Sequence, residues 1–290
     1  MFVEAIGPMV VFLGPAFNRA YQTRAAWRPR WSVIRDLFRL GWPAGMQFGN
    51  EIICWAIFMT VFVGHFGTEH MAAGWIALGY MHLSFMPAVG LSVATNSIVA
   101  KYVGAGQPDV AVSRARLSMV MGMVYMSVCA AIFIIFRTQL IEFFIAGSNI
   151  SAAERDSIIR IGANLLILVA LFQTVDAIGI VYTGALRGAG DTVWPGVLTA
   201  IYSWVFIVGG GWVAIRWFPE TESIGPWIAA AIYIILYGVT MLVRFERGRW
   251  RSIRILENDE RLEAGRAAPV TVGPPASGPD GAISDLVDPP

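Results

Sequence analysis

The chain has 290 residues, of which 56% are hydrophobic and only 14% are charged. Soluble domains carry about 25% charged residues, so this composition excludes an ordinary soluble domain and favours a lipid bilayer as the solvent. The net charge of +1 supplies no overall field for nucleic acid, which excludes nucleic acid as a partner.

The first 17 residues form an apolar piece that Pro8 and Pro15 interrupt. No basic segment precedes it and no small-residue cleavage site follows, so it does not resemble a signal peptide. It is also shorter than the roughly 20 residues that cross a bilayer. We expect residues 1–17 to be the end of a truncated transmembrane helix.

Residues 18–40 are rich in arginine and form the expected linker. Four apolar side chains recur there at helical spacing, namely Trp31, Ile34, Leu37 and Phe38. The polar residues Arg35, Asp36 and Arg39 lie off that face. This pattern predicts an amphipathic helix that rests on the membrane surface.

Six later segments have the length and apolarity of transmembrane helices. They are residues 41–64, 71–100, 117–136, 159–185, 193–215 and 224–243. These segments are apolar on nearly every side of the helix, which excludes amphipathic helices of a soluble protein. They are also too long for strands and lack the alternation of apolar and polar residues that strands show. The sequence therefore predicts an all-α membrane protein with a six-helix lobe over residues 41–245.

Lysine and arginine collect in alternate connections of this lobe. They are dense in the linker, present around Arg114 and Arg187, and dense again in the tail 246–290. Because basic connections stay in the cytoplasm, we expect the linker and the C-terminus to be cytoplasmic and the chain to lie in a bacterial inner membrane. The end of the tail, 264–290, is rich in Pro, Gly, Ala and Asp and is expected to be disordered.

Glu51 is an acid inside the first span, where a charge costs roughly 2.5–3.5 kcal/mol on insertion scales. At 1.5 Å per residue it lies on the order of 15 Å in from Gly41, near the middle of the membrane. Gln47 and Trp55 are one turn away on either side and share its face. A carboxylate with an amide and an indole suits a cation, whereas an interhelical hydrogen bond is the alternative interpretation.

Asp176 is a second acid of this kind, in the fourth span, with Gln173 three residues earlier on the same face. A structural hydrogen bond is again the alternative. Two such acids on different helices, if they face each other, favour a site where they share a proton or hold one cation.

The remaining features do not indicate catalysis. Pro87 permits a kink in the second span, and Gly104–Gly106 and Gly188–Asp191 form tight turns without the Lys-Ser/Thr of a phosphate loop. No nucleophile–base arrangement, dinucleotide fingerprint or metal-ligand spacing is present. We therefore expect no enzyme activity and no cofactor.

These motifs together resemble the multidrug and toxic compound extrusion (MATE) family, in its NorM-like branch. Pro43 with Glu51 eight residues later resembles the family's seventh helix, and the run from Pro87 to Gly106 resembles the eighth. The run from Asp176 to Pro195 resembles the end of the tenth helix and its loop, with the structural motif residues Gly184, Arg187, Gly188, Gly190 and Asp191. The resemblance covers about residues 31–254.

The resemblance implies the C-terminal lobe of a MATE/MOP-superfamily fold. Members exchange H⁺ or Na⁺ for small organic cations or drugs. By analogy Glu51 and Asp176 would bind the coupling ion, including Na⁺, and Gln47, Trp55, Phe172 and Gln173 would line the cavity. Phe172 stands where some relatives carry a tyrosine, and the lost oxygen weakens a sodium site more than a proton site.

The family has two six-helix lobes, so an N-terminal lobe is the expected missing partner. A fragment, a mis-assigned start and one half of a two-chain transporter all remain open. Two other functions also remain open. One is a lipid-linked oligosaccharide flippase of the same superfamily, although such cavities are usually basic. The other is a non-transporting membrane subunit.

Overall fold

The computed structural model describes residues 7, 9–10, 12–15, 31–148 and 150–252, and every regular element in this part of the chain is helical. Six stretches are long and apolar enough to cross a membrane: Gly45–Phe66, Thr68–Gly104, Pro108–Ile135, Ala152–Gly188, Val193–Trp217 and Ile224–Glu246. The predicted all-α class and six-helix lobe are confirmed. Most helices extend beyond the predicted ends, because hydropathy detects the apolar centre of a helix and misses its polar turns.

The elements follow one another with short connections. In chain order they are α3 (Trp31–Ile57), η2 (Phe58–Val63), η3 (Gly64–Phe66), α4 (Thr68–Gly104), α5 (Pro108–Ile135), α6 (Arg137–Ile145), α7 (Ala152–Gly188), α8 (Val193–Tyr202), η4 (Ser203–Gly209), α9 (Gly210–Trp217), η5 (Pro219–Thr221), α10 (Ile224–Glu246) and η6 (Arg249–Ser252). The first span is α3 continued by η2 and η3, and the fifth span is α8, η4 and α9 together.

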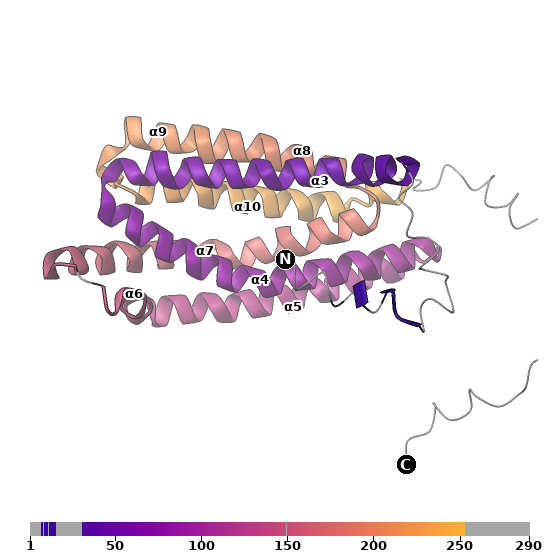
Figure 1. Ribbon diagram of the computed structural model, residues 1–290, viewed down its shortest axis with the longest axis horizontal. Coiled ribbons are helices and arrows are strands. Elements are labelled where there is room, and N and C mark those ends of the chain that lie inside the picture. Colours follow the sequence, from indigo (N-terminus) through magenta and orange to yellow (C-terminus); the bar gives the residue numbers. More distant parts are fainter. Residues whose placement is uncertain (1–6, 8, 11, 16–30, 149, 253–290) are drawn as a thin grey trace, which may run out of the picture. The chain divides into compact units, whose positions relative to one another are not determined.

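The helices associate in two groups (Figure 1). In one group α4, α5 and the short α6 pack on α7, and in the other α3 runs beside α8 and η4. Helix α10 contacts both groups, because it packs on α7 as well as on α8, η4 and α9. Helix α7 is the most enclosed of the six spans.

Glycines let neighbouring helices approach α7 closely. A Cβ on Gly184 would lie 2.4 Å from the carbonyl oxygen of Ser92 in α4, and one on Gly188 would lie 2.3 Å from that of Asn96. The Ser92 hydroxyl donates to the carbonyl of Ile180 at 2.7 Å, which fixes the same crossing. Gly184 and Gly188 thus form a small-xxx-small contact, the usual device for close packing in membranes.

Salt bridges join the helix ends on one side of the lobe. Arg116 of α5 pairs with Glu246 of α10, Arg244 pairs with Asp191, and Arg251 pairs with Asp109. We call this side, where α4, α7 and α10 end and α5 and α8 begin, the arginine-rich end. Gly106 and Gly190 have positive φ values of 70° and 87° there, so the two predicted tight turns are present.

Three helical features were not predicted. Helix α6 lies inside the predicted fourth connection and buries Ile141 and Ile145 against its neighbours. Two π-helical segments, η2 and η4, occur within the first and fifth spans. Helix α4, by contrast, is continuous through Pro87.

The predicted domain boundaries fall partly outside the described residues. Most of 1–17, all of 18–30, and 253–290 with its expected disordered tail are not described, so those assignments stay predictions. Helix α3 begins at Trp31 and runs unbroken through Gly41, so residues 31–40 share one helix with the first span. The backbone of Pro43 lies in this helix, and the structure does not describe its side chain.

Candidate functional site

Glu51 lies in α3, and its side chain is half-buried. Arg187, in the last turn of α7, and His82 of α4 lie close enough to act electrostatically on its carboxyl group. The first apolar span begins at Gly45 and Gln47 contacts Arg187, so Glu51 sits about 6 Å, one turn, from the arginine-rich end of α7. The expected mid-membrane depth of Glu51 stays a prediction.

Asp176 lies in α7 and is also half-buried. It stands roughly 16 Å along the helix axis from Arg187, and the charge of Glu51 acts on it. Helix α7, which carries Asp176, packs on α10, whereas α3, which carries Glu51, packs on α8 and η4. Two carboxylates that act on each other repel unless a proton or a metal cation compensates them.

Gln47 connects α3 to two other helices. Its side-chain oxygen accepts a hydrogen bond from Arg187 Nη2 at 2.7 Å, and its Nε2 donates to Thr199 Oγ1 of α8 at 3.1 Å. The Thr199 hydroxyl in turn donates to the carbonyl of Pro195 at 2.8 Å. Gln47, predicted to line a cavity, is therefore held on both sides in this structure.

Asn50, beside Glu51, forms a second polar connection that the sequence analysis missed. Its Nδ2 donates to Ser203 Oγ at 3.0 Å, and its Oδ1 accepts from Trp204 Nε1 at 2.8 Å. The sequence contained a signal for this connection. Asn50 follows Gln47 by three residues and Ser203 follows Thr199 by four, so each pair of polar side chains lies on one helical face. Pairing these faces required knowing that α3 lies beside α8.

The other predicted cavity residues pack among helices. Trp55 is half-buried, and its ring meets Phe58 edge-on at 5.3 Å between centroids. Phe172 and Gln173 are each 1% exposed. Gln173 donates to Met126 Sδ at 3.5 Å, and its Oε1 has no hydrogen-bond partner among the described residues. Their roles as cavity residues stay predictions.

The loop after α7 is fixed by a buried ion pair. Asp191, 5% exposed, accepts from Arg244 Nε at 2.8 Å, and the Arg244 guanidinium lies 4.7 Å from the ring centre of Trp194. Together with the close contacts of Gly184 and Gly188, this shows how the predicted motif residues hold the loop in place. Arg187, of the same motif, instead donates a hydrogen bond to Gln47 of α3.

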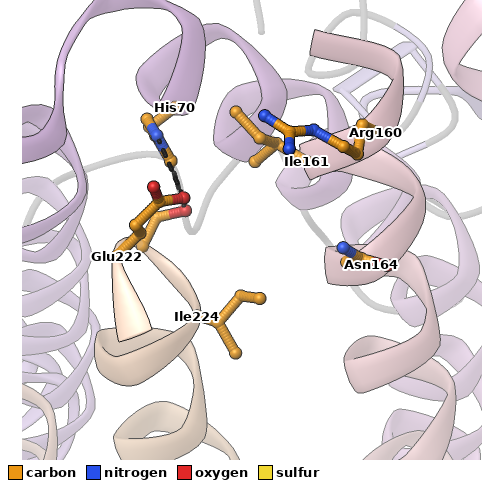
Figure 2. Close-up of a pocket in the computed structure, with 7 residues that line it drawn as sticks. His70, Arg160, Ile161, Asn164, Glu222 and Ile224 are labelled. Carbon is orange, nitrogen blue, oxygen red and sulfur yellow. Dashed lines mark hydrogen bonds and ion pairs between the residues drawn. The ribbon is translucent and has the colours of Figure 1, made fainter. Parts of the chain in front are cut away.

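A small open pocket of about 80 Å³ lies away from these residues (Figure 2). His70 approaches Ser223 Oγ at 2.8 Å and Glu222 Oε2 at 3.6 Å, and Arg160 and Asn164 line the opposite wall. Within the described residues no group of three or more His, Cys, Asp or Glu side chains could hold a metal ion. A metal at Glu51 and Asp176 would therefore need further oxygen ligands besides these two carboxylates.

Comparison with known proteins decides the family. The sequence profile of the family described as MatE matches residues 50–213. The chain belongs to the MATE family. Members of this family are transporters and not enzymes, which agrees with the expectation from the sequence, and the six apolar spans make this member a multi-pass membrane protein.

Curated relatives carry a multidrug name. The chain is 27% identical over 240 residues to the probable multidrug resistance protein NorM of Thermotoga maritima, covering 82% of this chain and 49% of that protein. A protein of the same name from Pseudomonas putida is 27% identical over 242 residues, with 83% and 51% covered. The chain thus spans about half the length of the curated relatives it matches.

Solved structures agree with the fold. An outward-facing multidrug resistance MATE family transporter of the MOP superfamily superposes with a TM-score of 0.68 at 16% identity, covering 79% of this chain and 50% of that one. A MOP superfamily transporter from Pyrococcus furiosus superposes with a TM-score of 0.69 at 16% identity, with the same shares covered. The six helices of this MATE chain therefore form the fold of one half of such a transporter.

Proposed function

We propose that this chain is the C-terminal lobe of a secondary antiporter that exports small organic cations or drugs in exchange for H⁺ or Na⁺. The observation that carries the proposal is the presence of two half-buried acids, Glu51 and Asp176, on separate membrane spans of the lobe. Acids inside membrane spans are costly, and they mark ion pathways in transporters. The multidrug names of the NorM relatives supply the substrate class.

The mechanism needs the ion to bind one conformation better than the other. A proton or Na⁺ at the acid pair would remove their repulsion and change the contacts that α3, α7 and α10 make around them. A ligand shifts a conformational equilibrium only through such a difference in affinity. Midplane sites between helices that move relative to one another serve this purpose in secondary transporters.

The proposal places the arginine-rich end in the cytoplasm of a bacterial inner membrane. The basic residues of α5, α7 and α10 at that end support this orientation. An N-terminal lobe would complete the drug pathway, because the matched relatives are about twice as long.

Glu51→Gln is the decisive variant for this function. It keeps the shape of the side chain but removes its charge, so ion-driven uptake of ethidium into liposomes that contain the 290-residue chain should fall at least about ten-fold, the loss that one charged hydrogen bond implies. Asp176→Asn should have the same effect. Glu142→Gln, which changes an exposed acid of α6, is the matched control and should leave uptake unchanged.

Two results would contradict the proposal. Uptake by Glu51→Gln at the unmodified rate would remove the assigned role of the acid pair. No uptake by the unmodified chain, even when it is reconstituted together with the N-terminal half of a NorM relative, would favour a non-transporting subunit.

A further inference from the structure

The pocket of Figure 2 lies at the end of the lobe opposite the arginine-rich end. His70 is in the first turn of α4 and Ile224 is the first residue of α10, whereas both helices finish at the arginine-rich end. Trp217, the last residue of α9, is 70% exposed and precedes the pocket by a few residues. Because tryptophan is enriched where hydrocarbon meets the polar headgroups, the pocket lies at the level of lipid headgroups.

Two opposite charges face each other across this pocket without pairing. Arg160 of α7 is exposed, and its guanidinium points across the opening toward the wall that carries His70 and Glu222 (Figure 2). Among the described residues Arg160 forms no ion pair and no side-chain hydrogen bond. The side chain of Glu222 is 59% exposed, and its Oε2 lies 3.6 Å from His70 Nε2, longer than a hydrogen bond. Both charged groups can therefore still bind a ligand in the pocket.

The backbone at Glu222 is held in an unfavourable conformation. Its φ of 50° and ψ of −142° lie in a region that residues with a Cβ rarely adopt. The next residue, Ser223, is 0% exposed, and its Oγ lies 2.8 Å from His70 Nδ1, which fixes the turn. Strained residues persist only where the surrounding structure determines them, and they cluster at binding sites. The conformation of Glu222 therefore favours a role for its carboxylate beyond closing the turn.

The other lining residues add a hydrogen-bond donor and an apolar surface. Asn164 follows Arg160 by four residues, so the amide and the guanidinium lie on one face of α7. Ile161 and Ile224 form the apolar part of the lining. The pocket encloses about 80 Å³, less than the roughly 300–1,000 Å³ of pockets for drug-sized ligands. It therefore suits a small polar group that is attached to an apolar body outside.

We propose that this pocket binds the headgroup of a membrane lipid that carries a phosphate and a primary ammonium, as phosphatidylethanolamine does. The phosphate would accept hydrogen bonds from Arg160 and Asn164, and the ammonium would donate to Glu222. The acyl chains would leave the pocket past Ile161 and Ile224 and enter the bilayer. This site is separate from the proposed ion site and does not depend on it.

The two charged walls decide which headgroup fits. A guanidinium binds phosphate through charge-assisted hydrogen bonds, and a primary ammonium offers three donors to a carboxylate. Phosphatidylcholine has no N–H to donate to Glu222, and phosphatidylglycerol brings no positive charge to it. Free phosphate would satisfy Arg160 but would place an anion opposite Glu222.

The test measures lipid binding to the unmodified 290-residue chain. Native mass spectrometry with increasing amounts of lipid gives a Kd for phosphatidylethanolamine, phosphatidylcholine and phosphatidylglycerol with identical acyl chains. We expect the first lipid to bind about ten-fold more tightly than the other two, the effect of one hydrogen bond to a charged group. This comparison uses no substitution, so it does not depend on how any variant folds.

Substitutions then separate the two walls. Arg160→Gln should weaken all three lipids about ten-fold, because they share the phosphate. Glu222→Ala should weaken phosphatidylethanolamine alone and bring its Kd to that of phosphatidylcholine. The matched controls are Arg216→Gln and Glu220→Ala, which change exposed charges near the same end but outside the pocket, and they should leave every Kd unchanged.

Soluble competitors distinguish a lipid from a free phosphate compound. O-phosphoethanolamine carries the same charged groups without acyl chains, and inorganic phosphate carries the anion alone. We expect neither to displace phosphatidylethanolamine when present at the concentration of the lipid. Displacement by either compound at that concentration would overturn the assignment to a lipid.

Two further results would overturn the site itself. One is an equal Kd for the three lipids in the unmodified chain, which would mean that lipids surround the helices without recognition of the headgroup. The other is unchanged binding of phosphatidylethanolamine in both Arg160→Gln and Glu222→Ala. Because the assay contains no transported ion or drug, its outcome is independent of the dye-uptake test of the proposed function.

Discussion

At the scale of single residues, the Asp191–Arg244 pair makes the strongest stability prediction. Asp191 is 5% exposed, and Arg244 is its ion-pair partner. Arg244→Ala would leave a buried carboxylate without compensation, which costs about 3 kcal/mol. Unfolding in sodium dodecyl sulfate, monitored by circular dichroism, should show that the free energy of unfolding falls by this amount.

The matched variants separate charge from packing. Asp191→Asn combined with Arg244→Gln removes both charges and keeps side chains that can form hydrogen bonds. The free energy of unfolding of the double variant should therefore fall by less than the sum of the decreases in the two single variants. If the decrease in the double variant equals the sum of the two single decreases, the two side chains contribute to stability independently.

The residue scale also shows what the sequence predicted about the site. The two acids could be found because an ionisable group in an apolar span stands out by its cost. The partner of Gln47 could not be found, because hydrogen bonds between α3, α7 and α8 depend on which helices are neighbours. For the same reason Arg187 was predicted as part of a structural loop motif, whereas its side chain donates a hydrogen bond to Gln47.

At the scale of elements, the crossing of α4 and α7 depends on two glycines. Gly184→Ala would place a Cβ 2.4 Å from the backbone oxygen of Ser92, so the two helices would have to separate. We expect a loss of about 1–3 kcal/mol in the same unfolding measurement. Such a cost reverses the usual benefit of alanine over glycine inside a helix.

Gly90 provides the control for this crossing. It lies in α4 with nothing within 4 Å of a built Cβ, so Gly90→Ala should be neutral or slightly stabilising. Equal destabilisation by Gly90→Ala and Gly184→Ala would refute the close-packing explanation.

Elements differed in how well the sequence predicted them. The six spans were found because about 20 apolar residues are needed to cross hydrocarbon and few other structures need them. Helix α6 was missed because its nine residues carry too short a pattern, and it is fixed by burying Ile141 against Gly162 of α7. The π-helical segments η2 and η4 have no composition of their own and follow from tertiary packing.

At the scale of the whole molecule, the charge distribution predicts which end of the lobe faces the cytoplasm. Asp109 marks the arginine-rich end and is 86% exposed. Glu220 lies in η5, between α9 and α10, and is exposed. The two ends of the spans lie on opposite sides of the membrane, so a reagent that cannot cross it distinguishes them.

A membrane-impermeant maleimide applied to spheroplasts measures this orientation. In a chain that carries Cys54→Ala and Cys129→Ala, Glu220→Cys should be labelled at once, and Asp109→Cys only after the membrane is permeabilised. The expected order follows because basic connections are retained in the cytoplasm. The reverse order would place Arg187 and its bond to Gln47 at the outer surface.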